Sequence, residues 1–354
     1  MKKLIPILGI AFAGILIFVT VRISMNIAEF AQLDRRSVKY NGQLHVDGNK
    51  ILNSRNEETQ LTGISTHGIQ WFDELYDANN VAQLKTEFGI NVFRIAMYTD
   101  PNANGYISNP SLKNKVFELI NAAIDQDIYV IIDWHILDDN NPQTYQSQAI
   151  EFFTEVSAKY PNQANIIYEI CNEPNGAEVT WADHIKPYAE AVIPAIRANS
   201  PNALIIVGTP DWSKDLASVD KAPLSDSNVA YALHFYAGSH NKTLRDKIDE
   251  FRDKNLAVFV SECGASDYQG DGILYDEAFK RWTDYMNARK ISWVFWSYSN
   301  KNEVSSILEP DYVPTYPTID PDTPEEEIEP FSLDEHLSAT GKMLKNIMKP
   351  QEDK

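Results

Sequence analysis

The sequence of 354 residues contains little cysteine and fewer basic than acidic residues. Its two cysteines, Cys171 and Cys263, are too few for a disulfide framework and lack the spacing of a metal-binding motif. With 31 basic and 50 acidic residues the net charge is −19, which disfavours binding of the soluble body to nucleic acid or anionic membranes. We therefore expect two buried free thiols that pack as small hydrophobic side chains, and no nucleic-acid partner.

A long uncharged apolar run occurs at the N-terminus, from Leu4 to Val21, between Lys2-Lys3 and Arg22. It is longer than the core of a secretory signal, and no small-x-small cleavage site follows it. Its length is at the threshold for a membrane-spanning helix, and the lysines favour a cytoplasmic N-terminus. We expect residues 1–25 to be a signal-anchor, with a cleaved signal peptide as the alternative. Either would place the rest of the chain outside the cell.

Eight apolar, β-branched runs recur after residue 59, most of them separated by segments with helical spacing. Near-continuous apolar runs are typical of parallel strands that are covered on both sides. The runs are QLTGISTHG, INVFRIAMY, IYVIIDWHI, NIIYEICNE, ALIIVGTP, VAYALHFY, LAVFVSECG and ISWVFWSYS. Eight such repeats predict an α/β fold, a (β/α)8 TIM barrel whose functional residues lie at the carboxyl ends of the strands.

The barrel domain is predicted to span residues 41–350. Residues 26–40 are expected to form a polar linker before it. GQLHVDGNKIL predicts an N-terminal β-hairpin around Asp47-Gly48. At the other end, residues 338–348 have the pattern of a closing helix.

A segment rich in proline and acid, residues 309–333, separates the last strand from the closing helix. Its composition cannot bury a core of its own, so we expect an extended loop. The loop is either a solvated excursion or a border of the functional groove through Tyr312 or Tyr316.

Two glutamates carry most of the functional information. Glu173 in NIIYEICNEPNG and Glu262 in AVFVSECGAS each stand at the polar end of an apolar strand, where a carboxylate is costly unless it has a role. Two carboxylates on separate strands of one barrel are what acid-assisted attack on an acetal carbon requires, so the pair predicts a glycosidase. By side-chain alternation, Cys171 should share a face with Glu173, and Cys263 should face away from Glu262.

Other polar and aromatic residues recur at the ends of the same strands, as expected for a barrel active site. One strand-end histidine is more often structural, and three of them could suggest a metal site. No HxH or HExxH spacing supports a metal. The residues are His67, Arg94, Tyr98, His135, Asn172, Glu173, Trp212, His234, Tyr236, Glu262 and Trp296.

These stretches resemble glycoside hydrolase family 5, the cellulase family, and most closely its bacterial endoglucanase branch. The resemblance runs from about residue 40 to the end, and the NEP and SECG motifs are specific as a pair. The matching stretches are LTGISTHGIQW, FRIAMY, IIDWHI, YEICNEPNG, YALHFYAG, VSECGASDYQG and WVFWSYSNKNE. The family often has a large aromatic residue where this chain has Cys263, so we expect altered packing behind that strand and retained activity.

The resemblance implies a retaining double displacement, with Glu262 as the nucleophile and Glu173 as the general acid/base. Their carboxyl groups should then lie about 5–5.5 Å apart. Arg94 and Tyr236 match family residues that contact the nucleophile, and Asn172 matches the contact to the sugar 2-hydroxyl.

The remaining site residues also follow from the resemblance. His135 and His234 match histidines that contact substrate and orient polar neighbours. The family uses no metal and no cofactor, and we expect a monomer. For Trp71 and Trp212 a packing role is an equally good alternative to substrate binding. The residues expected to bind glucose units are His67, Trp71, Tyr98, Trp212, Trp296, Lys301 and Glu303.

The leading hypothesis is an exported endo-β-1,4-glucanase acting on a neutral β-glucan polysaccharide or oligosaccharide. A β-mannanase or another β-glycanase of the same family would keep both glutamates. A non-catalytic glycan-binding barrel is the alternative from another class. An enzyme of phosphorylated metabolites is excluded, because GASDYQGDG and SNKNEVSS after the last two strands carry acids and little basic charge.

Overall fold

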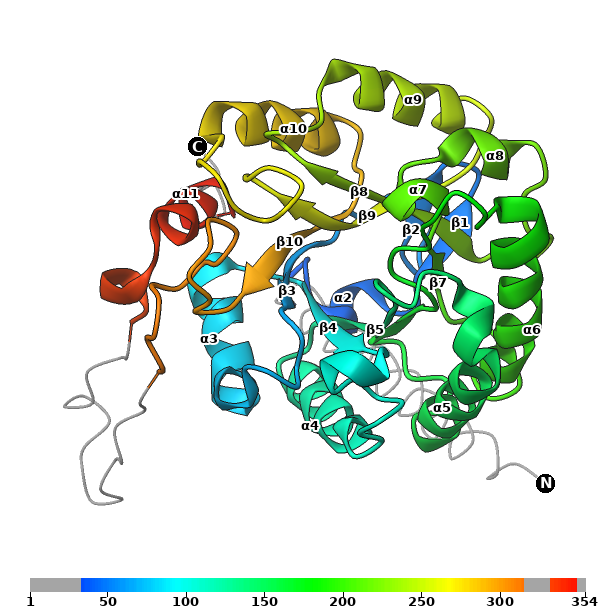
Figure 1. Ribbon diagram of the computed structural model, residues 1–354, viewed down its shortest axis with the longest axis horizontal. Coiled ribbons are helices and arrows are strands. Elements are labelled where there is room, and N and C mark those ends of the chain that lie inside the picture. Colours follow the sequence, from blue (N-terminus) through cyan, green and yellow to red (C-terminus); the bar gives the residue numbers. More distant parts are fainter. Residues whose placement is uncertain (1–32, 315–331, 349–354) are drawn as a thin grey trace, which may run out of the picture.

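A closed barrel of eight parallel strands forms the centre of the protein (Figure 1). The computed structural model describes residues 33–314 and 332–348. The barrel order is β10-β3-β4-β5-β6-β7-β8-β9, which confirms the predicted (β/α)8 topology. The strands are β3 (Thr62–Thr66), β4 (Val92–Tyr98), β5 (Tyr129–His135), β6 (Ile166–Glu169), β7 (Ile205–Val207), β8 (Val229–Tyr236), β9 (Val258–Gly264) and β10 (Trp293–Tyr298).

Helices between the strands surround the barrel as an outer ring (Figure 1). Their ends follow local sequence signals: in α3, the side chain of Asp77 accepts a hydrogen bond from the amide of Asn80, and Gly89 ends the helix with a φ of 62°. The helices are α3 (Ala78–Phe88), α4 (Leu112–Asp125), α5 (Gln146–Lys159), α6 (Lys186–Arg197), α7 (Pro210–Ser213), α8 (Leu216–Asp220), α9 (Lys242–Arg252), α10 (Asp276–Ala288) and α11 (Ala339–Met348).

Side-chain alternation divides the buried residues into two layers. In β5, Ile132 and Trp134 pack outward against the helices, whereas Ile131 packs inside the barrel. The next two inward positions along the same strand are Asp133 and His135. The interior therefore changes from apolar to polar toward the carboxyl ends of the strands, and this change places the functional groups.

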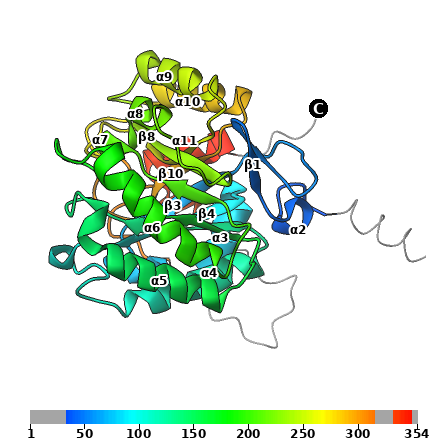
Figure 2. The same ribbon diagram turned by 90° about the vertical axis from the view of Figure 1, so that its right-hand side faces the viewer.

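The opposite end of the barrel is closed by the hairpin of β1 (His45–Asp47) and β2 (Lys50–Leu52) and by the short helix α2 (Val38–Asn41), which Figure 2 shows side by side. Val38, Leu44 and Ile51 join the inward-facing apolar residues of the barrel strands in one cluster. The folded body thus begins before residue 41, and the hairpin turn has Gly48 in the left-handed region, with a φ of 59°.

The predicted signal-anchor at residues 4–21 lies outside the described residues. Within 33–314 and 332–348, no helix has both the length and the apolar character needed to cross a bilayer. Most of the predicted acidic loop also lies outside the described residues, including Tyr316.

Candidate active site

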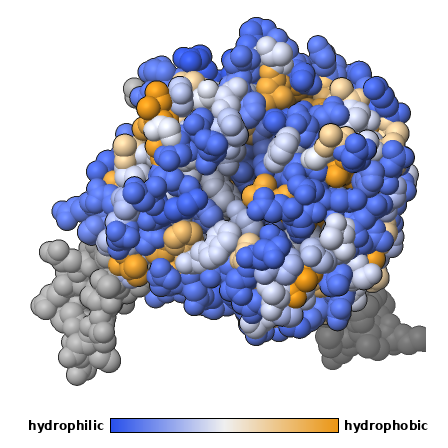
Figure 3. All heavy atoms as spheres, viewed as in Figure 1, coloured by the Kyte–Doolittle hydropathy of each residue, from blue (hydrophilic) through white to orange (hydrophobic). Residues whose placement is uncertain are grey.

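A cavity of about 680 Å³ opens at the carboxyl ends of the barrel strands. The space-filling view shows this mostly hydrophilic face hollowed near its centre (Figure 3). All the predicted site residues line the cavity except Arg94 and Asn172, which are buried beneath it. The lining residues that the sequence predicted are His67, Trp71, Tyr98, His135, Glu173, Trp212, His234, Tyr236, Glu262, Trp296, Lys301 and Glu303.

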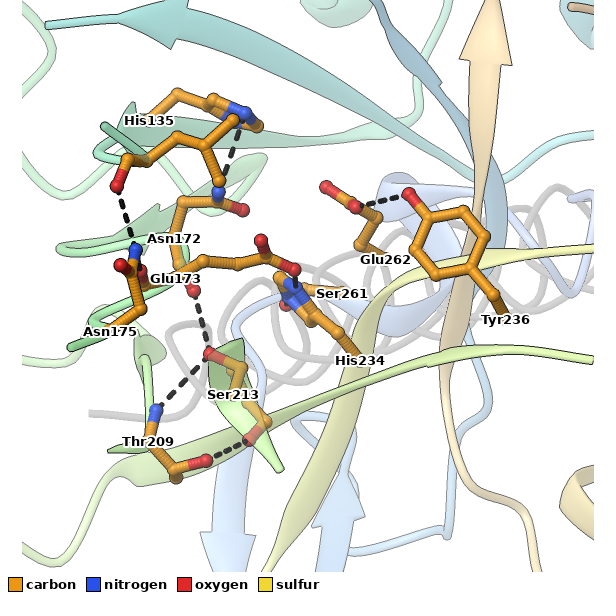
Figure 4. Close-up of polar contacts among 12 residues, drawn as sticks. His135, Asn172, Glu173, Asn175, Thr209, Ser213, His234, Tyr236, Ser261 and Glu262 are labelled. Atoms are coloured by element: carbon orange, nitrogen blue, oxygen red, sulfur yellow. Dashed lines mark hydrogen bonds and ion pairs between the residues drawn. The ribbon is translucent and has the colours of Figure 1, made fainter. Parts of the chain in front are cut away.

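Glu173 and Glu262 face each other across the cavity (Figure 4). Glu262 is part of β9, and Glu173 follows the end of β6, where its backbone amide donates to the carbonyl oxygen of Ile136. One carboxylate oxygen of Glu173 and one of Glu262 lie within 4.8 Å of each other. This separation is on the scale of the distance of about 5–5.5 Å in retaining glycosidases and is short of the distance of about 6.5–9.5 Å in inverting ones, which seat the attacking water between the two carboxyl groups.

Glu262 is held by two hydrogen-bond donors. The hydroxyl of Tyr236 donates to Oε1 at 2.7 Å, and Nη1 of Arg94 lies 3.2 Å from Oε2. Burial and the charges of Glu262 and Glu173 raise the pKa of Tyr236, so this residue keeps its proton and remains a donor. Arg94 and Tyr236 thus both contact Glu262, as the resemblance implied.

Arg94 is itself fixed by two buried carboxylates that the sequence reasoning missed. Its Nε donates to Glu169 at 2.7 Å, and its Nη2 lies 3.0 Å from Asp133 and donates to Oδ1 of Asn172 at 2.7 Å. Burial alone would lower the pKa of Arg94, but Asp133, Glu169 and Glu262 raise it, so the guanidinium stays charged. Three carboxylates around one cation form the base of the site.

Glu173 is paired with His234. Nδ1 of His234 lies 2.8 Å from Oε1 of Glu173, and its Nε2 lies 3.0 Å from the hydroxyl of Ser261 (Figure 4). Burial opposes a charge on this ring, but the carboxylates of Glu169, Glu173 and Glu262 raise the pKa of His234 to about 10. The contact between His234 and Glu173 therefore holds a proton at neutral pH.

His135 has the opposite charge state. Its Nδ1 lies 2.6 Å from Asp133, and its Nε2 lies 3.3 Å from the amide nitrogen of Asn172. Burial and the positive charge of Arg94 lower the pKa of His135 to about 3, so the ring is neutral. Its face stacks against Trp296 at a centroid distance of 5.3 Å. The neutral His135 thus orients Asn172 by accepting a hydrogen bond from its amide nitrogen and adds no charge to the site.

A second polar group occupies another part of the cavity. Glu303 forms an ion pair of 2.5 Å with Lys301 and accepts a hydrogen bond of 2.6 Å from Ser305. Nε2 of His67 lies 3.8 Å from Glu303, and its Nδ1 accepts the amide proton of Gly68 at 2.7 Å. Because Nδ1 is an acceptor, the proton of His67 is on Nε2, which points toward Glu303. This group presents hydrogen-bond donors and acceptors to the cavity.

The aromatic residues at the cavity mouth are exposed, which favours the groove over the packing alternative. Trp71 and Trp212 are 44% and 43% exposed. The ring centroids of Trp71 and Tyr98 lie 4.7 Å apart. This packing requires glycine at position 68, because a Cβ there would lie 2.6 Å from the Trp71 ring. Trp212 lies in a turn with a positive φ of 55°, and its amide donates to the carbonyl oxygen of Pro174.

Several residues of the site were not predicted. Asp133, Glu169 and Ser261 are polar residues at inward positions of apolar strands, and their cost of burial was the signal that could have identified them. The others come from loops without periodic pattern. They are Asp100, Ala103, Leu137, Asp138, Lys214, Ser239, His240, Tyr268, Gln269 and Gly270.

At the edge of the site, one of two alternatives does not hold for Tyr312, and the prediction for Cys171 was wrong. Tyr312 does not line the cavity; its ring stacks on His336 with a centroid distance of 3.8 Å. Cys171 does not share a face with Glu173, because β6 ends at Glu169 and Cys171 turns into the outer core. Both cysteines are buried and free, as predicted, and Cys263 contacts the carbonyl oxygen of Val294 behind its strand.

Among the described residues, Glu173, His234 and Glu262 form the one group of three side chains close enough to surround a metal ion. The contact of 2.8 Å between His234 and Glu173 is a hydrogen-bond distance. It is shorter than the separation of about 3.3 Å or more expected between two ligands bound to one zinc ion at 2.0–2.2 Å. The spacing of His234 and Glu173 therefore fits a hydrogen bond between them better than two ligands of one zinc ion.

The low pKa of His67, about 3, predicts a pH-dependent loss of stability. Burial and the charge of Lys301 keep the folded ring neutral, whereas the unfolded chain binds a proton below about pH 6.5. The His67 contribution is thus fully present above pH 6.5 and falls as the pH is lowered toward 3. Between pH 7 and 5 a His67→Gln variant should lose about 1–2 kcal/mol less unfolding free energy than the wild type.

Urea denaturation at the two pH values measures this difference. His45→Gln, in the exposed hairpin, is the matched control and should lose as much as the wild type. Equal losses for wild type and His67→Gln would contradict the neutral state of His67.

Comparison of the sequence with known proteins identifies the family of this chain. The sequence matches the family "Cellulase (glycosyl hydrolase family 5)" over residues 52–302. It is 49% identical over 259 residues to endoglucanase A of Evansella cellulosilytica, an alignment that covers 73% of this chain and 53% of that protein. It is 46% identical over 292 residues to endoglucanase N of Pectobacterium atrosepticum, covering 82% and 65%. The chain thus spans between about half and two thirds of the length of these relatives.

Solved structures agree with the sequence matches. The cellulase Cel5C_n superposes with a TM-score of 0.80 at 37% identity, covering 89% of this chain and 94% of that one. The catalytic domain of Thermobifida fusca endoglucanase Cel5A, solved with cellotetraose, superposes with a TM-score of 0.79 at 33% identity, covering 88% and 99%. The chain described here belongs to the cellulase family, glycosyl hydrolase family 5.

Proposed function

We propose that this protein is a retaining endo-β-1,4-glucanase that cleaves internal bonds of a neutral β-glucan. The observation that carries the proposal is the pair of carboxylates within 4.8 Å, each in a different environment. Glu262 accepts hydrogen bonds from Arg94 and Tyr236, and Glu173 is in contact with Nδ1 of His234, which can carry a proton. A carboxylate fixed by donors suits a nucleophile, and a carboxyl group beside a proton carrier suits a general acid.

In the first step, an oxygen of Glu262 forms a bond to the anomeric carbon while the bond from that carbon to the glycosidic oxygen breaks. The proton of Glu173 moves to the glycosidic oxygen, and the leaving sugar departs as an alcohol. In this step Asn172, fixed by Arg94, is positioned to contact the sugar 2-hydroxyl, where a hydrogen bond strengthens in the transition state.

In the second step, the Glu173 carboxylate removes a proton from water, and the water oxygen attacks the anomeric carbon. The ester bond to Glu262 breaks, which regenerates the Glu262 carboxylate and the Glu173 carboxyl group. Two inversions at the same carbon give net retention.

An endo-acting mode is supported by the positions of the exposed tryptophans. Trp71 follows β3 and Trp212 follows β7, two strands that are four places apart in the barrel order and therefore lie on opposite sides of the mouth. Flat aromatic rings can stack against sugar rings on both sides of the cleavage point. The relatives named endoglucanase and the cellotetraose complex of Cel5A support a β-1,4-glucan as the substrate class.

The substrate class is tested by measuring hydrolysis of carboxymethyl cellulose, mannan and xyloglucan side by side. We expect carboxymethyl cellulose to be cleaved fastest, with a rapid fall in viscosity because internal bonds are cut. A preference for mannan of tenfold or more in rate would favour a mannanase, and no hydrolysis of any of the three would favour a non-catalytic binding barrel.

The roles of the two glutamates are tested by single substitutions. Glu173→Gln should lower kcat on cellooligosaccharides by roughly 10²–10⁴-fold because it cannot donate a proton. Glu262→Gln should lose at least as much because it lacks the nucleophile. A 2-deoxy-2-fluoro cellobioside with a good leaving group should label Glu262, detected by mass spectrometry of its peptide.

Glu178→Gln provides the matched control, because Glu178 is exposed just beyond the same motif, and it should retain wild-type rates. Wild-type rates in either active-site variant, or a label on another residue, would disprove the assigned roles.

We also propose that the enzyme acts outside the cell and is anchored by residues 4–21. The support is the uncharged run of these residues behind Lys2 and Lys3, together with a polymeric substrate that does not enter cells. Intact-mass measurement of membrane and secreted fractions should find the full-length chain in the membrane. A secreted form lacking about the first 25 residues would indicate a cleaved signal peptide instead.

A further inference from the structure

Beneath Glu173, three buried side chains form a hydrogen-bonded chain, which runs from His234 through Ser261 to a second acid, Glu169. The hydroxyl of Ser261 donates to Oε1 of Glu169 at 2.6 Å, and Nε2 of His234 lies 3.0 Å from the same hydroxyl oxygen. Ser261 and Glu169 are fully buried, and His234 is 2% exposed. Because the side chains are packed away from solvent, they must satisfy one another.

The donors and acceptors in this chain can be assigned. Glu169 is ionised: burial opposes its charge, but Arg94 and His234 lower its pKa to about 2, so both its oxygens accept. Its Oε2 accepts from Arg94, and its Oε1 accepts the single hydrogen of Ser261. Since Ser261 has no second hydrogen, its oxygen can only accept from His234, so Nε2 of His234 carries a proton.

From this assignment we propose that Ser261 and Glu169 are positioning residues for the acid/base step. Their hydrogen bond fixes one proton of His234 on Nε2 and leaves Nδ1 as the nitrogen that gains or loses a proton opposite Glu173. The inference rests on the proposed role of Glu173. Ser261 and Glu169 would act on this step through His234, because both are buried below the cavity.

The arrangement gives His234 one variable nitrogen, in contact with the acid/base at 2.8 Å. When Glu173 holds the proton, Nδ1 accepts it; when Glu173 is a carboxylate, a protonated Nδ1 donates to it. The contact therefore survives both steps of the reaction. Without Ser261, the neutral ring could carry its proton on either nitrogen. In the tautomer with the proton on Nδ1, that nitrogen could not accept the proton of Glu173.

The charged groups around the ring come from several strands. Glu169 and Glu173 approach from β6 and the segment after it, and Glu262 from β9. Asp133 and the neutral His135 face it from β5. Removing the acceptor for the Nε2 proton should weaken proton binding by the His234–Glu173 pair, so activity should be lost at a lower pH on the alkaline side.

The test compares Ser261→Ala, Ser261→Thr and the wild type by ¹⁵N NMR of labelled histidine and by kinetics on aryl β-cellobiosides. In the wild type, Nε2 of His234 should stay protonated at every pH and only Nδ1 should titrate; His234→Gln identifies the signals. In Ser261→Ala, a neutral form with the proton on Nδ1 should appear. Ser261→Thr keeps the hydroxyl and should restore the wild-type pattern.

The kinetic readout separates positioning from general damage. Ser261→Ala should shift the alkaline limb of the kcat/KM profile to lower pH. It should also slow substrates with poor leaving groups by about tenfold, a part of the roughly 10²–10⁴-fold effect of a positioned acid. The 2,4-dinitrophenyl substrate, which needs little protonation, should be slowed less. Ser157→Ala removes an equally buried hydroxyl from α5 and should change neither property.

Three results would overturn the proposal: an unprotonated Nε2 in the neutral wild-type ring, an unchanged pH profile in Ser261→Ala, or an equal loss at all pH values and with all leaving groups. If the wild type hydrolyses no β-glucoside, the proposed function fails. The NMR assignment would still decide whether Ser261 fixes the proton of His234.

Discussion

The buried guanidinium of Arg94 is the constraint on which the site depends. Removing a cation from water costs several kcal/mol unless anions and hydrogen bonds replace the lost solvation. In this barrel the replacement comes from Glu169 at 2.7 Å, Asp133 at 3.0 Å and Glu262 at 3.2 Å. Because Arg94 lies at an inward position of β4, these carboxylates must converge on the barrel axis, and Glu262 is held at the cavity, where the proposed mechanism needs a nucleophile.

The sequence was sufficient for the fold, since apolar runs at regular intervals define a barrel and place function at one end of it. It was also sufficient to place Glu173 and Glu262 in the cavity, because a carboxylate at the end of an apolar strand is costly unless it has a role. It could not identify Glu169 as a partner of Arg94, because that contact joins residues 75 positions apart through side-chain directions inside the barrel. Cys171 was misplaced for a related reason: strand alternation was extended past Glu169, where β6 ends.

The two central histidines show why residue type alone does not determine chemistry. His135 and His234 are both buried, yet the pKa of His135 falls to about 3 and that of His234 rises to about 10. His135 lies beside the Arg94 cation, whereas His234 lies between the carboxylates of Glu169 and Glu173. Both occupy similar places at strand ends in the sequence, so their opposite charge states arise only from contacts across the barrel.

Glu169 connects the surroundings of the two cavity glutamates. It reaches Glu262 through Arg94, which both acids share, and it reaches Glu173 through Ser261 and His234. One buried anion thus supports a cation beside the proposed nucleophile, Glu262, and a proton beside the proposed acid, Glu173. Because an unpaired buried charge is costly, loss of this anion would weaken both the charge on the guanidinium and the proton on the imidazole. The two upper glutamates therefore differ in their partners, a guanidinium beside Glu262 and an imidazole beside Glu173, and both partners are held by the layer below them.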